Sequence, residues 1–163
     1  MAKIKWIFLI YKIPREPSSK RVYVWRKLKK LEAVTLQDAV FVLPYSEKTF
    51  EQFQWLAAEI IEMDGESSVW ESYVTTNSQE KALVQKFTDN INTQYENIIQ
   101  KLNNIIAITD ICEKEKQMRN IINEYMDIKY YDYFKSKFSD KIDEIITREQ
   151  KQLNEVKFNG ESE

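Results

Sequence analysis

The chain has 163 residues, of which 43% are apolar and 13% aromatic, enough to bury a core in one domain or in a small domain with an extension. It contains no histidine and a single cysteine, Cys112, which excludes an intrachain disulfide, a Cys/His zinc site and a Ser-His-Asp or Cys-His catalytic set within one chain. The net charge of −2 divides unevenly, because residues 1–33 carry ten Lys/Arg and two Asp/Glu, a net +8, and the remainder carries −10.

The first predicted element is a buried strand over residues 5–13, a continuous run of apolar, aromatic and β-branched side chains that ends at Pro14. A helix follows at 19–32, where Ser18 or Ser19 can cap the first turn. The helical repeat places four apolar side chains on one face of this helix: Val24, Trp25, Leu28 and Leu31. Its basic side chains lie on the opposite face or at the margins, so we expect an amphipathic helix.

The next predicted elements are two strands, a helix and a strand, at 33–37, 39–43, 47–64 and 68–75. Gln37-Asp38 marks a turn or bulge between the two short strands. Ser46 is placed to cap the helix, and Asp64-Gly65 ends it because glycine suits the position after the last turn. The six elements alternate in the order β-α-β-β-α-β.

Strand signals vanish from Asn77 onward, and apolar residues then follow helical spacing. Three helices are predicted there, at 78–108, 111–128 and 136–156. The fold class is therefore α+β: a ferredoxin-like βαββαβ sheet domain followed by an all-helical C-terminal extension. We expect the sheet domain at 1–76, the helical extension packed on it at 77–158, and a frayed tail at 159–163.

An anion-binding surface is predicted on the first helix and the loop before it. Free backbone N–H groups and the macrodipole favour an anion at a helix N-terminus, and basic side chains extend that surface over about three turns. A stripe of this kind suits nucleic-acid phosphates and makes binding weaken steeply with salt. The expected contacts are Arg15, Lys20, Arg21, Arg26, Lys27 and Lys30. The competing interpretation is a solvated helix face that the acidic second half balances.

Other chemistry-bearing residues have simpler interpretations. The aromatic cluster at 130–134 fits packing at a corner between helices better than base stacking. Asp38 suits a turn, and Cys112 beside apolar residues suits a small core filler. The acids near the end of the second helix form a solvated end rather than a metal site: Glu59, Glu62, Asp64 and Glu66. We therefore expect no metal, no cofactor and no catalytic residue.

Several stretches resemble the N-terminal domain of chromate-resistance regulators of the ChrB type. These are Ile10–Val22, Val24–Leu31, Ala33–Asp38 and Val42–Pro44, with Tyr95-Glu96 and Asp132-Tyr133-Phe134 as further landmarks. In that family the domain is coupled to a second domain in a chromate-responsive transcription regulator, so the resemblance implies DNA binding. Similar domains occur in repressors of phenylacetate degradation and in CRISPR adaptation nucleases, which implies a dimer. This chain ends where longer relatives begin the second domain, so we expect effector sensing to involve a separate protein.

These observations lead us to expect a cytoplasmic, homodimeric, non-catalytic regulatory protein that binds DNA through backbone phosphates. Residues 5–13 are too short to span a membrane, so no membrane association is expected. Two alternatives stay open: a dimeric protein-interaction module without DNA binding, and a divergent metal-dependent nuclease of the CRISPR adaptation type. The nuclease is disfavoured because no carboxylate ends the first strand. A narrower possibility is oxyanion binding at Arg15 and the start of the first helix.

Overall fold

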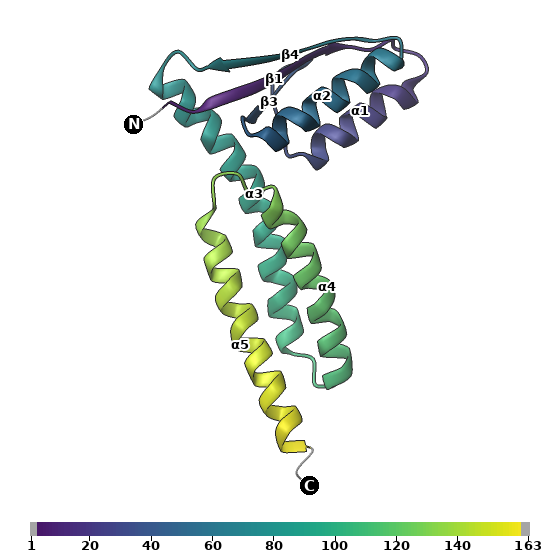
Figure 1. Cartoon of the computed structure of the whole chain (residues 1–163). Helices are drawn as coiled ribbons and strands as arrows, with labels where there is room; N and C mark the ends of the chain where they lie inside the picture. The colour runs from purple at the N-terminus through teal and green to yellow at the C-terminus, as the bar shows by residue number, and fades with distance from the viewer. Residues whose placement is uncertain (1–2, 161–163) are drawn as a thin grey trace. The chain divides into compact units, whose positions relative to one another are not determined.

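The computed structural model describes residues 3–160, and the chain divides between Phe87 and Thr88 into two compact units. This division falls inside one long helix, α3 (Asn77–Ile106). The first unit is a mixed structure of strands and helices, and the second is helical (Figure 1). The domain limits drawn from the sequence, and the packing of the second part on the first, stay a prediction.

The first unit confirms the predicted order of elements and the α+β class. In chain order these are β1 (Lys5–Lys12), α1 (Ser18–Lys30), β2 (Val34–Gln37), β3 (Val40–Pro44), α2 (Glu47–Glu62) and β4 (Glu66–Tyr73). The sheet order is β2-β3-β1-β4, and every neighbouring pair of strands is antiparallel. The β2–β3 register shifts between Thr35 and Gln37, next to the predicted turn or bulge.

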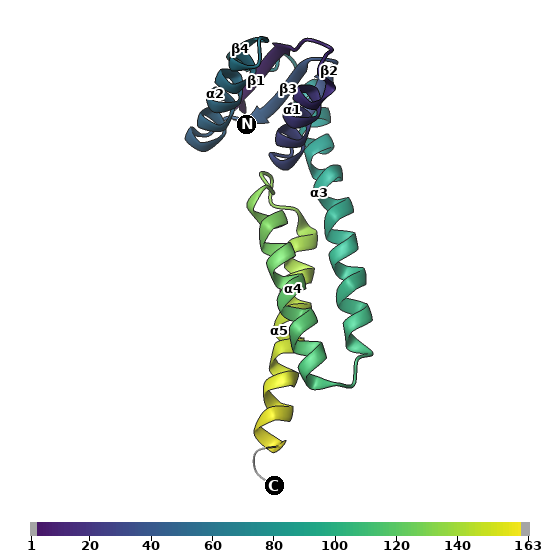
Figure 2. The same cartoon turned by 90° about the vertical axis from the view of Figure 1, so that its right-hand side faces the viewer.

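One face of this sheet is covered by both helices of the unit. Figures 1 and 2 show α1 and α2 on the same side of the strands. The strand residues Ile7 and Leu9 are fully buried, as are Val24 of α1 and Ile60 of α2. On the other face, the Trp6 ring stacks on Phe87 of α3 at 5.7 Å between ring centroids. Because side chains alternate along β1, this strand makes apolar contacts on both faces of the sheet.

Two expectations for α1 are wrong. The helix begins at Ser18 with Pro17 in the N-cap position, and no side chain caps it, because the proline ring has no acceptor atom for a helix N–H. Trp25 does not share the buried face, since 53% of its surface is exposed. It lies one residue, or about 100° of helical rotation, from buried Val24, and that step turns its ring toward the edge of the helix.

The start of α2 is confirmed and its end differs in detail. Ser46 Oγ accepts from the Thr49 backbone N–H at 3.1 Å, and Thr49 Oγ1 accepts from the Ser46 N–H at 2.8 Å, which completes a reciprocal cap. After the helix, Asp64 rather than Gly65 has the left-handed conformation, with φ of 63°. Gly65 is required for space, because a Cβ there would lie 2.7 Å from the carbonyl oxygen of Lys12.

The second unit contains the later part of α3, then α4 (Ile111–Tyr130) and α5 (Lys137–Gly160), which lie side by side (Figures 1 and 2). All three predicted helices are confirmed, with ends that differ by a few residues. Each helix contributes to one core that includes Ile98, Leu102, Met118, Tyr125, Ile142 and Ile145. Asn159 and Gly160, expected to fray, belong to α5, and 161–163 lie outside the described residues. Among the described helices, none combines the length and apolarity needed to cross a membrane.

Candidate nucleic-acid interface

Helix α1 presents a basic outer surface because its apolar residues anchor only one side of it. Val24 and Leu28 are buried under the helix, at 0% and 1% exposure. The predicted contacts that lie outward are all exposed: Arg21, Arg26, Lys27 and Lys30 on the helix, and Arg15 in the preceding loop. The pattern of the sequence therefore places five of the six predicted cations on the surface of the first unit.

These cations are not neutralised within the protein. Among residues 3–160, no ion pair or side-chain hydrogen bond involves Arg15, Arg21, Arg26 or Lys30. The Lys27 ammonium lies 5.5 Å from the ring centroid of Tyr23, a cation–π contact that keeps its charge. Unpaired cations retain their full attraction for an external anion, whereas an internal ion pair would weaken it.

Lys20 differs from the other five. Its ammonium donates to the Met63 carbonyl oxygen at 3.0 Å and lies 3.4 Å from Asp64 Oδ2. A cation beside the last carbonyl groups of a helix is favourable, since the macrodipole makes that end negative. Lys20 therefore ties the first turn of α1 to the end of α2, a contact that no sequence signal indicated.

Exposed aromatic rings accompany the cations on α1. Tyr23 and Trp25 are 38% and 53% exposed, and the Lys29 ammonium lies 5.5 Å from the Trp25 ring centroid. Rings of this kind can stack on bases or sugars where nucleic acid meets a basic surface. Sequence reasoning missed them because it assigned Trp25 to the core. The four-residue spacing of Tyr23 to Lys27 and of Trp25 to Lys29 was the available signal.

A groove lies beside α1, with a cavity volume of about 570 Å³. Its lining comes from the end of β1, the first turns of α1 and the β2–β3 turn, and includes Tyr11, Arg21, Trp25 and Asp38. The Tyr11 backbone N–H donates to the Ala39 carbonyl at 3.1 Å, which fixes the turn beside β1. Burial raises the pKa of the Tyr11 hydroxyl, and the Arg21 charge opposes that rise.

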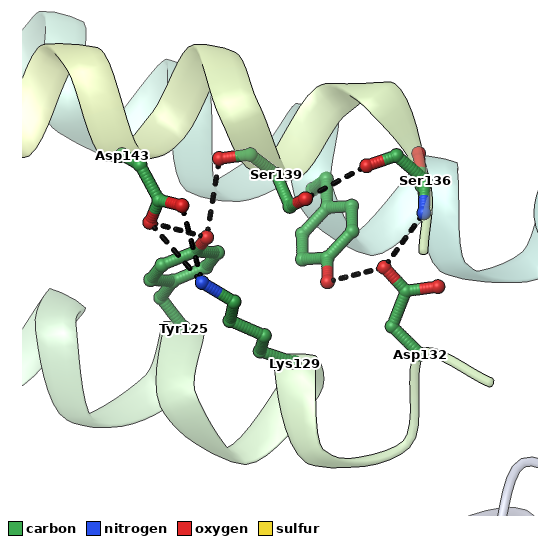
Figure 3. A network of polar contacts seen from close by, with 7 residues as sticks. Tyr125, Lys129, Asp132, Ser136, Ser139 and Asp143 are labelled. Atoms are coloured by element: carbon green, nitrogen blue, oxygen red, sulfur yellow. Dashed lines mark hydrogen bonds and ion pairs between the residues drawn. The ribbon is translucent and has the colours of Figure 1, made fainter. Parts of the chain in front are cut away.

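A separate polar cluster joins the three helices of the second unit (Figure 3). Tyr95 donates its hydroxyl proton to Asp132 Oδ2 at 2.8 Å, and the Ser136 backbone N–H donates to the same oxygen at 2.9 Å. Nearby, Tyr125 donates to Asp143 Oδ1 at 2.7 Å. Two of the sequence landmarks, Tyr95 and Asp132, are therefore in direct contact although they are 37 residues apart.

The pKa values of the two tyrosine hydroxyls in this cluster are raised. Burial, with the hydrogen bond to Asp132, raises the pKa of Tyr95 far above its usual range, and the pKa of Tyr125 rises for the same reasons beside Asp143. Both hydroxyls stay protonated donors under physiological conditions, so neither can act as a general base. Their arrangement positions the connection between α4 and α5 against α3.

The remaining candidate residues within 3–160 are characterised by their grouping and their exposure. Within the described ranges, no three Asp, Glu or Cys side chains are grouped so that they could hold a metal ion. Cys112 is exposed, so its interpretation as a core filler is wrong. In the aromatic cluster, the Tyr130 and Tyr131 rings meet edge to face at 4.9 Å, which is a packing contact between neighbouring side chains.

Comparison with known proteins gives one match. A family model described as protein ChrB, N-terminal, matches residues 21–157. The matched range includes four of the predicted cations, Arg21, Arg26, Lys27 and Lys30, together with the Tyr95–Asp132 contact. A search of curated proteins and a search of solved structures each find no match.

Proposed function

The chain belongs to the family of the N-terminal part of protein ChrB, and on that premise we propose that it is a chromate-resistance regulatory protein that binds DNA without catalysing a reaction. The observation that carries this proposal is the surface of α1. Exposed cations that form no ion pair with any residue in the range 3–160 follow one helix over three turns, beside exposed aromatic rings. Phosphate groups are the polyanion that such a surface fits best.

The geometry supports contact with the DNA backbone rather than with base edges. Long flexible lysine and arginine side chains on one exposed helix can each meet a phosphate oxygen, and α1 is about 20 Å long from its 13 residues. Each cation that meets a phosphate displaces a counterion, so the number of contacts sets the salt dependence of the affinity. Binding through α1 would then be strong at low salt and weakly sequence-specific.

The proposal has three further parts. The first unit is ferredoxin-like, which its βαββαβ order and its β2-β3-β1-β4 antiparallel sheet support. The protein is a homodimer, as the resemblance of its first part to repressors of phenylacetate degradation and CRISPR adaptation nucleases implies, and it acts in the cytoplasm. Effector sensing by a separate protein is the third part of the proposal.

The test is fluorescence anisotropy of a labelled DNA duplex across a salt series. We expect the triple variant R26A/K27A/K30A to lower duplex affinity at least about tenfold and to reduce the slope of log affinity against log salt by about three. The matched control is K116A/K141A/K151A, which removes three exposed lysines from α4 and α5. Its affinity should stay close to that of the unmodified protein.

Equal losses in the two triple variants would contradict the assignment to α1, since only net charge would then matter. Absence of duplex binding near physiological salt would overturn DNA binding itself. Salt-dependent binding of an acidic protein in its place would favour the interaction module.

A further inference from the structure

The groove beside α1 combines features that a phosphate surface alone does not need. Three elements build it within the first unit, and the hydrogen bond from Tyr11 N–H to Ala39 O holds two of them together. Its volume of about 570 Å³ lies in the range of sites for small organic groups. The groove is therefore large enough for a planar ring together with the sugar and phosphate that carry it.

Aromatic side chains form much of the groove. The Tyr11 and Phe41 rings stack at 5.9 Å between centroids with an angle of 26° between their planes. Phe41 is buried, Tyr11 is half-buried, and Trp25 lines the groove with 53% of its surface exposed. An exposed tryptophan that lines the same groove as these packed rings offers a large flat surface to another aromatic ring.

The polar groups of the groove carry charges of both signs. Arg21 and Lys12 are cations, and Asp38 in the β2–β3 turn supplies two acceptor oxygens. Within the part of the chain that the structure describes, the side chains of Arg21 and Asp38 form no hydrogen bond or ion pair. A ligand that satisfies all of them needs an anionic group, a planar ring and an N–H donor.

We infer that this groove holds an unpaired base of single-stranded nucleic acid, stacked on Trp25, with its phosphate at Arg21 and its exocyclic amine donating to Asp38. The inference rests on the proposed function and narrows it to unpaired strands or to a base displaced from a duplex. A nucleotide has the three required groups in one molecule. Arg21 and Trp25 also belong to the helix that carries Arg26, Lys27 and Lys30, so a strand in the groove continues onto the basic surface.

The test compares short labelled strands of deoxycytidine and of thymidine with a labelled duplex. Cytosine has an exocyclic amine and thymine has none, so the unmodified protein should prefer the deoxycytidine strand. Trp25→Ala should weaken binding of both strands at least about fivefold, and clearly more than it weakens duplex binding, because a paired base cannot enter the groove. Trp55→Ala is the matched control, because Trp55 is 66% exposed on α2 and does not line the groove. Asp38→Ala, at an exposed turn, should remove the preference for cytosine without lowering affinity for thymidine.

Three outcomes would overturn the inference. If Trp25→Ala and Trp55→Ala bind the single strands equally well and duplex binding is intact, no base stacks on Trp25 in the groove. The proposed phosphate contacts of α1 would still be supported by that result. Displacement of the strand by free deoxycytidine monophosphate at the same low concentration would show that a free nucleotide is the ligand. If the protein binds neither the duplex nor the single strands, the result would contradict both the proposed function and this inference.

Discussion

The hydroxyl of Tyr95 and the carboxylate of Asp132 form the contact in which individual atoms matter most. Tyr95 is fully buried, and Asp132 Oδ2 accepts both its hydroxyl proton and the Ser136 N–H. Burial, together with the hydrogen bond to Asp132, stabilises the neutral form of the Tyr95 hydroxyl. The contact therefore depends on Tyr95 staying protonated.

The stability of the second unit should fall in alkaline solution. The folded state raises the pKa of Tyr95 above its unfolded value of about 10, so this contribution is complete below pH 10 and is lost as pH rises above it. Tyr95→Phe should cost about 1–2 kcal/mol at neutral pH through the lost hydrogen bond, and it should make the alkaline fall shallower. Tyr125 has a raised pKa as well, so part of the fall remains. Urea unfolding followed by far-ultraviolet circular dichroism between pH 7 and 11 measures both effects.

Tyr73→Phe serves as the control for that series. Tyr73 is 54% exposed in β4, and its hydroxyl donates no hydrogen bond to another described residue. Its removal should change neither the free energy of unfolding at neutral pH nor the alkaline profile. An alkaline profile of Tyr95→Phe that matches the unmodified protein would contradict the role assigned to the buried hydroxyl.

At the scale of single elements, the two helices of the first unit begin in different ways. Ser46 and Thr49 exchange hydrogen bonds at the start of α2, and Thr49 Oγ1 also donates to the Pro44 carbonyl at 2.7 Å. α1 has no side-chain cap, and Pro17 sets its entry through backbone geometry. A serine side chain at the start of α2 should therefore contribute more to the free energy of unfolding than one at the start of α1.

Ser46→Ala should lower the free energy of unfolding by about 1 kcal/mol, because it leaves the Thr49 N–H without its acceptor. Ser19→Ala should change it by less than about 0.5 kcal/mol, since the Ser19 hydroxyl caps nothing and alanine favours the helix. Thermal or urea unfolding of the two variants side by side makes the comparison. Equal effects would mean that the reciprocal cap at Ser46 contributes no stability.

The sequence predicted elements wherever a local pattern decides the structure. The continuous apolar run of β1, the Ser46 cap and the helical spacing after Asn77 are patterns of that kind. Prediction from the sequence failed where tertiary packing decides whether a side chain is buried. Trp25 is an example, because its exposure depends on which side of α1 meets the sheet. The close approach of Gly65, just before β4, to the carbonyl of Lys12 at the end of β1 is likewise a tertiary contact, which spacing alone does not indicate.

At the scale of the whole molecule, each unit has its own core, and all four tryptophans belong to the first unit. Trp6, Trp25, Trp55 and Trp70 all precede the division between Phe87 and Thr88. The second unit contains an ion pair that is nearly inaccessible to solvent: Glu149 is 2% exposed, and its Oε2 lies 3.3 Å from the Lys114 ammonium. Tryptophan fluorescence thus reports on the first unit, and Lys114 gives a way to perturb the second.

Lys114→Met should destabilise the second unit by about 3 kcal/mol, because it leaves a buried carboxylate without its main partner. We expect the circular-dichroism transition to move to lower urea while the tryptophan-fluorescence transition moves little. The double variant K114M/E149L should recover most of the loss, since apolar residues of similar volume replace a buried pair well. Identical shifts in both signals would show instead that the two units unfold as one cooperative structure.

Of the candidate site, the sequence predicted the charge but not its surroundings. The cations of α1 follow from composition and helical repeat, and five of the six are exposed as expected. The contact of Lys20 with the end of α2 joins residues 43 positions apart, and the groove joins three elements. Such relationships arise only once the sheet brings β1, α1 and the β2–β3 turn together.

The Tyr95–Asp132 hydrogen bond also bears on how this chain can change over evolutionary time. Loss of the phenol leaves a carboxylate with one fewer donor, and loss of the carboxylate leaves a buried hydroxyl without an acceptor. Either substitution alone leaves a polar group of this pair unmatched, whereas exchange of both for apolar residues leaves only the Ser136 N–H to find another acceptor. We expect relatives of this protein to keep both residues or to replace both, so that positions 95 and 132 co-vary.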